Sequence, residues 1–401
     1  MDSIIGLLGE QRTWEQFLAN RLLKGRLGWH AFEAADAFVA GECYRDVVRR
    51  LTNGEGLSVP VRHLVNKMGT GRKRVVYSYR DDEMTVLKAL AWLLYRYDDR
   101  LPPNLYSFRR GLTAHDAVRR LMRDVGDRPM WAYKLDIHDY FNSIAVGLLL
   151  PLLRELLADE PLYRLLEQML TDGRARWDGK VISEEHGVMA GTPTSPFLAN
   201  VFLMEVDRHF ADLGVTYARY SDDIILFAPT REELDRHIAT LRQMLHDRRL
   251  MVNPDKVRIY RPGEPFDFLG FLCQGQTIDI AEATRRKMKG KIRRLARRLV
   301  RWRQRKGRTA EAAMRALASH FNRKFFECDD PEALSWSRWF FPLVNRTEGL
   351  RDIDRYLQHY LRHVATGHHR KANFRIRYSE LRAVGYRSLV HEYWRWRHER
   401  P

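Results

Sequence analysis

Residues 219–227 read Arg-Tyr-Ser-Asp-Asp-Ile-Ile-Leu-Phe, and this stretch decides how the rest of the chain is interpreted. Apolar runs rich in β-branched and aromatic residues lie on both sides, so the pattern predicts a β-hairpin with Ser221, Asp222 and Asp223 at its tip. Adjacent carboxylates repel each other unless a cation joins them. Because divalent cations prefer oxygen ligands, the pair is interpreted either as part of a metal site or as a solvated turn.

The composition favours a folded chain with a polyanionic partner. Among 401 residues, 69 Lys and Arg face 51 Asp and Glu, a formal net charge of +18, and 45% of the residues are hydrophobic. Such an excess on a globular chain is typical of nucleic-acid binding, with an anionic membrane surface as the alternative. No apolar stretch reaches transmembrane length and no secretion signal is visible, so we expect a cytoplasmic protein without membrane contact.

Three widely spaced cysteines form no CxxC pair. This spacing predicts neither a zinc site nor a disulfide framework, and it fits a reducing compartment.

Residues 131–137, Trp-Ala-Tyr-Lys-Leu-Asp-Ile, alternate with period two and predict a β-strand. Its large apolar side chains lie on one face, and Lys134 and Asp136 lie on the other. An acid at the end of a strand with a buried opposite face is well placed to be a rigid metal ligand. Tyr140 and Phe141 follow at a turn into a helix, where core packing is the alternative interpretation.

Two basic segments suit phosphate groups. Residues 67–80 predict a hairpin with a Gly-containing turn, either a triphosphate clamp or an ordinary basic surface hairpin. Thr113 and Asp116 have the spacing of a capping box, which predicts the start of a helix. Arg109, Arg110 and that helix N-terminus together suit a phosphate.

Further along, the Gly/Pro/Thr/Ser-rich loop that opens residues 187–203 allows a flat group to approach the backbone closely before a helix begins.

A long basic helix is predicted for residues 285–308, which contain fourteen Lys and Arg and no acid. Met288, Ile292, Leu295, Leu299 and Trp302 recur at helical spacing and predict a buried apolar seam. A solvated surface helix usually mixes both signs of charge, so we expect this one to lie along a phosphate backbone. The remainder to residue 401 is predicted to be helical.

These segments, in this order, resemble the reverse transcriptase family. The resemblance covers roughly residues 65–275 and rests on three main motifs. These are the first palm motif, Lys-Leu-Asp-Ile-His-Asp-Tyr-Phe at 134–141; the Gly-x-x-x-Ser-Pro-x-x-x-Asn motif at 191–200; and the Tyr-x-Asp-Asp hairpin at 220–223. Residues 253–256 and 268–270 are similar to two later palm motifs, and residues 106–116 to the finger motif of group II intron and related bacterial enzymes.

The resemblance implies an α+β fold shaped like a right hand. The domains expected from it are an N-terminal helical extension, fingers, a palm with an antiparallel sheet that carries the Tyr-Ser-Asp-Asp hairpin, and a helical basic thumb with a C-terminal module. Their expected bounds are 1–64, 65–130, 131–275 and 276–401.

The resemblance also implies two-metal nucleotidyl transfer with Mg²⁺, or alternatively Mn²⁺. Asp136, Asp222 and Asp223 are the implied metal ligands together with Ile137, although Asp223 is also open to an orienting role, and Lys256 is a candidate general acid near the leaving group. The implied nucleotide-binding residues are Lys67, Arg74, Asp139, Tyr140, Phe141, Ala190 and Gly191, with Phe141 as the steric gate against a 2′-hydroxyl. The implied nucleic-acid-binding residues are Arg109, Arg110, Ser195, Pro196, Tyr220, Arg294, Arg298 and Arg305.

Two positions depart from the family pattern. Met189 and Ala190 stand where many relatives have Pro-Gln, and the Gln normally touches the incoming nucleotide. Ser221 stands where Ala is usual. The subfamily stays open, since Thr192–Pro196 is similar to retron enzymes and Arg109–Asp116 to group II enzymes.

The expected function is RNA-directed DNA synthesis in a bacterial antiphage defence system with a cognate non-coding RNA. The expected partners are that RNA as template, the DNA product and dNTPs, with a homo-oligomer or an accessory defence protein left open. The alternatives are an untemplated or protein-primed DNA polymerase, a retron or group II-like enzyme, and a non-catalytic RNA-binding scaffold.

Overall fold

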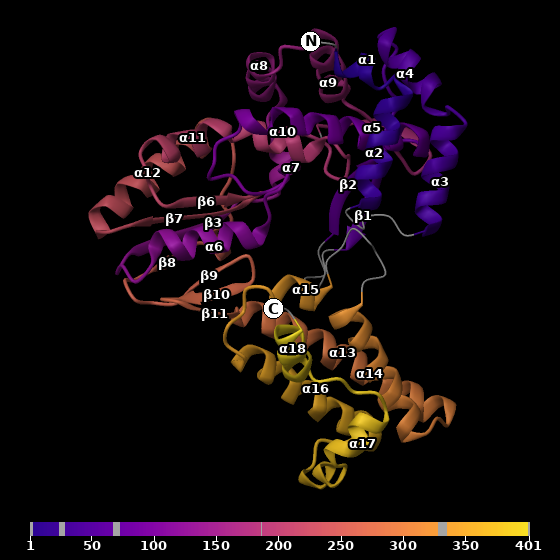
Figure 1. Cartoon of the computed structure of the whole chain (residues 1–401), viewed down its shortest axis with the longest axis vertical. Helices are drawn as coiled ribbons and strands as arrows, with labels where there is room; N and C mark the ends of the chain where they lie inside the picture. The colour runs from indigo at the N-terminus through magenta and orange to yellow at the C-terminus, as the bar shows by residue number, and fades with distance from the viewer. Residues whose placement is uncertain (1–2, 24–28, 67–72, 186, 328–334, 400–401) are drawn as a thin grey trace. The chain divides into compact units, whose positions relative to one another are not determined.

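The computed structural model describes residues 3–23, 29–66, 73–185, 187–327 and 335–399, drawn as ribbons in Figure 1. The chain divides into two compact units, unit 1 (Met1–Glu264) and unit 2 (Pro265–Pro401). Among the described residues, no helix combines the length and the apolar character needed to span a bilayer. The four domain bounds expected from the sequence stay predictions.

The N-terminal part of unit 1 is helical, as predicted. Its core is built on Trp14, which stacks on Tyr44 at 4.6 Å between ring centroids and donates its indole N–H to the carbonyl of Leu8 at 2.8 Å. The elements are α1 (Ile4–Leu7), α2 (Gln11–Leu23), α3 (Trp29–Ala40) and α4 (Tyr44–Thr52).

The first sheet of unit 1 contains an antiparallel strand pair of which only the second strand falls within the hairpin predicted for 67–80, since the first strand precedes those bounds. Strands β1 (Val61–Asn66) and β2 (Lys73–Ser78) pair antiparallel, so the strand after the turn is where it was predicted. Lys67 lies outside the described residues. The sheet order is β2-β1-β4-β5, completed by β4 (Arg174–Trp177) and β5 (Lys180–Ser183).

The second sheet of unit 1 has the order β6-β7-β3-β8, and its neighbouring strands are all antiparallel (Figure 1). Its strands are β3 (Trp131–Asp136), β6 (Tyr217–Tyr220), β7 (Asp223–Ala228) and β8 (Arg258–Tyr260). Tyr133, Leu135, Ile224 and Leu226 are buried in the two central strands. The predicted strand at 131–137 and the predicted Asp-Asp hairpin are therefore adjacent in one sheet.

Helices pack around this sheet, with α12 against β3 and β7 and with α6 and α11 against β6. The capping box predicted at Thr113 is present, because its hydroxyl accepts from the N–H of Asp116 while the Asp116 carboxylate accepts from the N–H of Thr113. The remaining elements of unit 1 are α5 (Asp81–Leu93), η1 (Leu94–Arg100), α6 (Ala114–Val125), α7 (Tyr140–Ser143), α8 (Val146–Leu156), α9 (Glu160–Thr171), α10 (Ser195–Phe202), α11 (Met204–Asp212), α12 (Arg231–Asp247) and η2 (Pro254–Lys256).

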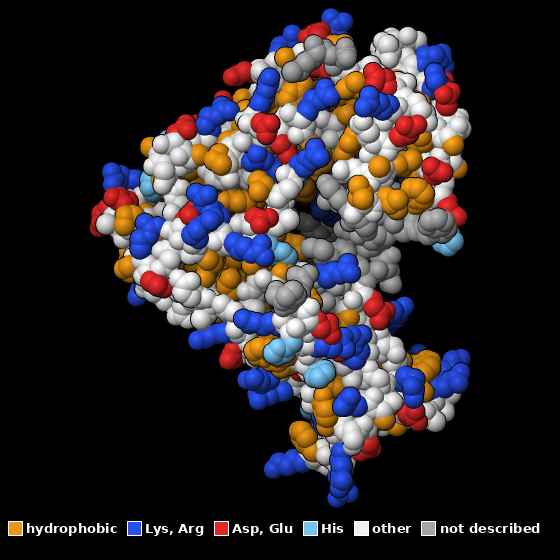
Figure 2. All heavy atoms as spheres, in the orientation of Figure 1, with side chains coloured by type: hydrophobic (Ala, Val, Ile, Leu, Met, Phe, Trp, Pro, Cys, Tyr) orange, Lys and Arg blue, Asp and Glu red, His pale blue; other side chains and the backbone are white. Residues whose placement is uncertain are grey.

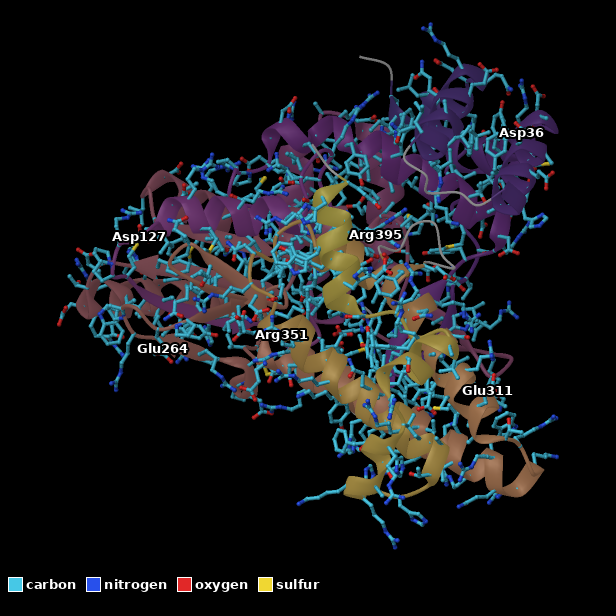
Figure 3. All side chains as sticks on the ribbon, turned by 60° about the horizontal axis from the view of Figure 1, so that its bottom comes forward. Asp36, Asp127, Glu264, Glu311, Arg351 and Arg395 are labelled. Carbon is cyan, nitrogen blue, oxygen red and sulfur yellow. The ribbon has the colours of Figure 1, made fainter. Side chains whose placement is uncertain are left out.

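Unit 2 is a small antiparallel sheet followed by helices. Figure 3 labels Glu311 on α14, Arg351 on α16 and Arg395 on α18. The sheet order is β11-β10-β9. The elements are β9 (Phe266–Phe268), β10 (Phe271–Gln274), β11 (Thr277–Ile280), α13 (Glu282–Lys306), α14 (Ala310–Phe326), α15 (Trp336–Phe340), α16 (Glu348–Thr366), η3 (Lys371–Arg375), α17 (Tyr378–Ala383) and α18 (Leu389–His398).

The predicted basic helix is α13, which packs against α14 and α16 and ends at Gly307 in the left-handed conformation (φ 56°). Met288 and Ile292 are buried as predicted, together with Ala296. The prediction was wrong for Trp302, which is 37% exposed and lies under the guanidinium of Arg308. Arg294, Arg298 and Arg305 are exposed, and Figure 2 shows Lys and Arg side chains spread over the visible face of the molecule.

Candidate active site

Three acidic residues lie near one another in the backbone where β3 ends and the β6–β7 hairpin turns. In the antiparallel register Asp136 lies opposite Asp223, and the N–H of Ile137 donates to the carbonyl of Asp222 at 3.0 Å. Asp222 occupies the turn itself, so strand pairing brings together acids that are far apart in the sequence. The predicted grouping of these three residues is thus seen in the fold.

The surroundings of Asp222 disfavour the ionised form of its carboxyl group. Burial raises the pKa of Asp222, and the neighbouring Asp136 carboxylate raises it further, while Lys256 and Arg74 oppose the shift. A raised carboxyl pKa means that the ionised form is under-stabilised by the chain itself. A bound cation would supply the missing stabilisation.

Two lysines partly neutralise the cluster. The ammonium of Lys256 lies 2.6 Å from Oδ2 of Asp136, and that of Lys134 lies 3.8 Å from Oδ2 of Asp223. Within the described part of the chain, no three acidic, His or Cys side chains already stand in a metal-binding arrangement. The chemistry of the donor set nevertheless fits a hard divalent cation, which would compete with Lys256 for Oδ2 of Asp136.

The aromatic pair after β3 divides into a buried and a partly exposed residue. Tyr140 is buried, its hydroxyl donates to the carbonyl of Ala199, and burial raises its pKa. Phe141 is only partly buried, with the guanidinium of Arg74 5.9 Å from its ring centre and Phe108 edge-on at 6.3 Å. Asp139, just before this pair, is exposed and adopts a left-handed conformation (φ 45°). Among the predicted nucleotide-binding residues, Phe141 thus lies beside both Arg74 and Tyr140, whose ring centre is 5.8 Å away.

The small-residue loop before α10 is approached closely by a strand of the same chain. The N–H of Tyr77 in β2 donates to the carbonyl of Ala190 at 2.8 Å. Gly191 has φ 106°, and a Cβ there would lie 2.9 Å from the carbonyl oxygen of Tyr77. Glycine is required because it alone tolerates both the conformation and the close contact. Strand β2 therefore approaches this backbone closely, and the approach of a flat group stays a prediction.

Several predicted nucleic-acid contacts have structural partners within the chain. The Ser195 hydroxyl is buried and donates to the carbonyls of Val188 and Met189, and Pro196 is the second residue of α10. The guanidinium of Arg109 donates to the carbonyls of Asp98, Pro102 and Leu105, whereas Arg110 is exposed. Tyr220 is half-buried, and burial raises the pKa of its phenol. Their assignment to nucleic acid stays a prediction.

Sequence reasoning missed a buried ion pair beside the turn that carries Asp222. Arg219 and Asp207 are both fully buried, with Nη2 of the arginine 2.5 Å from Oδ2 of the aspartate. Although burial alone would lower it, Asp207 raises the pKa of Arg219. The available signal was a charged residue within the apolar run of β6, where an arginine needs a buried partner.

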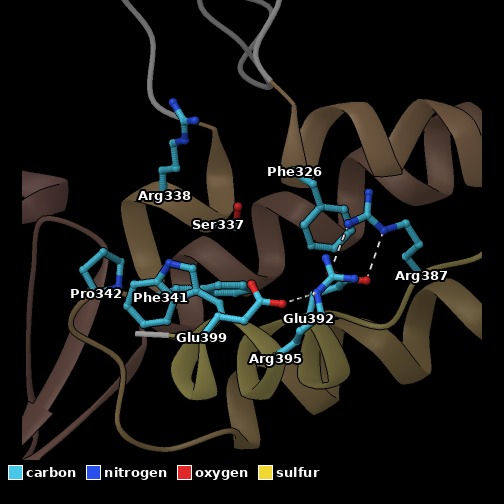
Figure 4. Close-up of a pocket in the computed structure, with 10 residues that line it drawn as sticks. Phe326, Ser337, Arg338, Phe341, Pro342, Arg387, Glu392, Arg395 and Glu399 are labelled. Carbon is cyan, nitrogen blue, oxygen red and sulfur yellow. Dashed lines mark hydrogen bonds and ion pairs between the residues drawn. The ribbon is translucent and has the colours of Figure 1, made fainter. Parts of the chain in front are cut away.

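A second acidic residue with arginine partners lies in unit 2, at a cavity of about 640 Å³. Figure 4 shows Glu392 between Arg387 and Arg395, with Phe341 beside them. Burial alone would raise the pKa of Glu392, but hydrogen bonds and charge from Arg387, together with the charge of Arg395, lower it. This carboxylate is satisfied by the chain itself.

A protein-family model matches the part of the chain that contains these three acids. Residues 65–273 match the family model described as reverse transcriptase (RNA-dependent DNA polymerase). The chain is 30% identical over 140 residues to the Retron Mx65 reverse transcriptase of Myxococcus xanthus, covering 32% of this chain and 33% of that one. It is 24% identical over 220 residues to the Group II intron-encoded protein LtrA of Lactococcus lactis, covering 53% and 35%. The chain thus spans about a third of the length of these two relatives.

Among solved structures, telomerase from Candida albicans in complex with a fragment of telomeric RNA aligns with a TM-score of 0.47 and 11% identity, over 86% of this chain and 68% of that one. The family match and the antiparallel sheets agree with the predicted α+β polymerase fold.

Proposed function

The chain belongs to the reverse transcriptase family, and we propose that it synthesises DNA on an RNA template. The observation that carries this proposal is the cluster of Asp136, Asp222 and Asp223 at the junction of β3 and the β6–β7 hairpin. The family generally uses divalent metal ions, and Mg²⁺ is the ion proposed here. When bound, such ions activate a primer hydroxyl and stabilise the leaving pyrophosphate.

The chain's own residues would bind and orient the reactants. Asp136 and Asp222 present carboxylate oxygens from two adjacent elements, so their spacing is held by the sheet. Lys256, already within 2.6 Å of Asp136, carries a positive charge to the place where negative charge develops on the departing phosphates. Asp223 is held toward Lys134 and would orient the site or bind metal directly.

The incoming nucleotide would be held by Arg74 and Phe141. The guanidinium of Arg74 lies over the Phe141 ring, so a triphosphate bound by Arg74 would bring its sugar against that ring. A ring at this place leaves little room for a 2′-hydroxyl, which favours deoxynucleotides. Ala190 is buried and its carbonyl is used by β2, so it supplies no side chain comparable to a glutamine.

The proposed biological role is antiphage defence with a cognate non-coding RNA as template. The net charge of +18 and the exposed cations of α13 support binding of a polyanion. A protein-primed or untemplated polymerase is the second candidate, favoured by Ala190 at the position of a nucleotide-contacting residue. Sequencing the nucleic acid that copurifies with the protein, before and after protease treatment, would distinguish template, product and priming group.

Primer extension tests the activity itself. The purified protein is given a DNA primer on an RNA template with dNTPs and Mg²⁺, and we expect Asp222→Asn to abolish incorporation because it removes a charge with almost no change in volume. Asp212→Asn is the matched control, since Asp212 is exposed at the end of α11. If Asp222→Asn extended the primer as fast as wild type, this active-site assignment would be wrong.

A further inference from the structure

We propose that Arg219 and Asp207 are positioning residues for the metal-binding carboxylate Asp222, acting through a clamp on the turn peptide of the β6–β7 hairpin. The proposal rests on the proposed polymerase function, because it concerns the same site. Neither residue touches the expected substrate or metal. What they are proposed to supply is the conformation from which Asp222 projects.

The pair itself has the geometry of a rigid two-point contact. Nε of Arg219 lies 2.8 Å from Oδ1 of Asp207, and Nη2 lies 2.5 Å from Oδ2. Parallel bonds of this kind fix the orientation of the guanidinium plane as well as its distance. Tyr217 donates its hydroxyl to the same carboxylate at 2.9 Å, so Asp207 is held on two sides.

The remaining donors of Arg219 reach the turn and the helix beside it. Nη1 donates to the carbonyl of Ser221 at 3.3 Å, and Nη2 donates to the carbonyl of Asn200 in α10 at 3.2 Å. The Ser221 carbonyl belongs to the peptide bond that leads into Asp222. A displacement of the guanidinium would therefore be transmitted to Asp222 through one peptide unit.

The same turn residue is also held by its N–H. Ser221 donates this N–H to the hydroxyl of Ser107 at 2.8 Å, and Asn200 fixes the Ser107 backbone by donating its side-chain amide to the Ser107 carbonyl at 2.8 Å. Ser221 has φ 60°, a left-handed conformation that costs a non-glycine residue free energy. Bonds at both ends of the residue compensate for that cost and leave the turn a single conformation.

Residues 104–106 add further hydrogen bonds that hold strand β6. Residue 105 forms a parallel bridge with Arg219, with the N–H of Tyr106 donating to the Arg219 carbonyl and the N–H of Arg219 donating to the Asn104 carbonyl, both at 3.0 Å. Asn104 also donates its side-chain amide to the Asp207 carbonyl at 2.8 Å. Strand β6 is thus anchored on the edge opposite β7.

Stability alone is a weak explanation for this arrangement. A buried ion pair is often no better for stability than well-packed apolar residues of similar size, and the neighbourhood is already apolar and aromatic, with Phe210 stacked on Tyr217 at 5.0 Å. Apolar residues would not hold the Ser221 carbonyl, which accepts a hydrogen bond from Arg219. Directional bonding to the turn is what the pair adds.

Three variants separate positioning from folding. Asp207→Asn removes the negative charge that pairs with Arg219. Ser107→Ala is a milder change, because it removes only the hydroxyl that accepts from the Ser221 N–H. Tyr217→Phe is the matched control, because it removes a hydroxyl bonded to Asp207 but none bonded to the turn. Each is measured for thermal stability, for Mn²⁺ affinity by electron paramagnetic resonance without substrate, and for the Mg²⁺ concentration at half-maximal incorporation.

We expect Asp207→Asn and Ser107→Ala to weaken Mn²⁺ binding and to raise the Mg²⁺ requirement by about 10-fold, the usual effect of losing a group that orients a metal ligand. The Michaelis constant for primer–template should stay unchanged, and Tyr217→Phe should change thermal stability alone. Should Ser107→Ala and every folded Asp207→Asn preparation bind Mn²⁺ like wild type, the clamp would be a purely structural device.

The two proposals fail differently. A wild-type protein that binds Mn²⁺ at Asp222 but incorporates no nucleotide contradicts the polymerase function and leaves the clamp testable by Mn²⁺ affinity. A wild-type protein that incorporates nucleotides while its clamp variants keep normal metal dependence contradicts the clamp and leaves the function intact.

Discussion

The two units gather different charges, carboxylates at one turn in unit 1 and cations along one helix in unit 2. In unit 1, Asp136, Asp222 and Asp223 gather at one turn, where Lys256 lies close to Asp136 and Lys134 lies close to Asp223. In unit 2, α13 brings a run of cations of which a few are paired, such as Arg285 and Lys289 with Asp352 of α16. Each region is proposed to bind a charged partner from outside the chain. A metal ion suits the first and nucleic-acid phosphates suit the second.

Glu392, which pairs with two arginines, is a useful reference for the carboxylate of Asp222. Asp222 and Glu392 are both acids shielded from water, yet the pKa of Asp222 is raised and that of Glu392 is lowered. The difference lies in the neighbours, since Asp222 faces another carboxylate and Glu392 faces two guanidinium groups. The opposite directions of the two pKa shifts therefore reflect the different charges that surround these two carboxylates.

The largest effect is expected on α13. Changing Arg294, Arg298 and Arg305 together to Gln should weaken RNA binding by about 10- to 100-fold near 0.1 M salt, and should reduce the slope of log affinity against log salt by about 0.7–0.9 for each true phosphate contact. Titrations at several salt concentrations measure both. Single-turnover incorporation at saturating primer–template should change little.

The control for this triple change replaces three other surface arginines, each of which pairs with an acidic residue. Arg164, Arg231 and Arg315 each bond an acid four residues away on the same helix. Their replacement by Gln removes the same net charge. An equal fall in salt slope in both triple variants would mean that α13 acts only through overall charge.

The next largest effect is expected at Phe141 in unit 1, which is proposed to limit the space beneath the sugar of the nucleotide. Phe141→Val should open space beneath the sugar and lower the preference for dNTPs over NTPs by about 10-fold or more, as expected when a substrate gains room for one small group. The measurement is the ratio of kcat/KM for the two substrates. Phe108→Leu, beside Phe141, is the control for general loosening. An unchanged ratio would leave Phe141 as a packing residue.

The unbalanced carboxylates predict a smaller, pH-dependent effect on stability. Because its folded pKa is raised, Asp222 opposes folding once it is ionised, and this cost is absent below the ordinary carboxyl range and grows as pH rises through the folded pKa. Without metal, Asp222→Asn should raise Tm at pH 7, by about 2–4 °C per kcal/mol of repulsion relieved, and the gain should vanish toward pH 3. Added Mg²⁺ should stabilise wild type more than the variant; equal stabilisation would place the metal elsewhere.

The smallest effect, of opposite sign, is expected at Glu392. Its lowered pKa means that the ionised form favours folding above the ordinary carboxyl range, and that this contribution is lost as pH falls through the folded pKa. Glu392→Gln should therefore cost about 1 kcal/mol at pH 7, a modest value because Arg387 and Arg395 are 36% and 51% exposed. Thermal melts across pH 3–7 test this, and a gain in stability would contradict it.

Patterns with short range were readable from the sequence. The alternation at 131–137 predicted β3, the apolar runs around Asp222 predicted the hairpin, and the spacing of Thr113 and Asp116 predicted the cap of α6. These features depend on side-chain direction and backbone bonding within a few residues, which the order of residues specifies directly. The motif order also pointed to the family that residues 65–273 match.

Features that depend on burial and on distant partners were decided by the tertiary structure. Arg219 lies in the stretch that opened the interpretation, but its partners Asp207, Asn200 and Ser221 are set by how α10, α11 and β6 pack. Trp302 fits the helical seam by spacing and is nonetheless 37% exposed, because spacing specifies a face of the helix and not how far neighbouring helices cover it. The sequence by itself determined which carboxylates gather at the turn; only packing decided which groups hold that turn in place, because directional contacts between distant segments have no local signature.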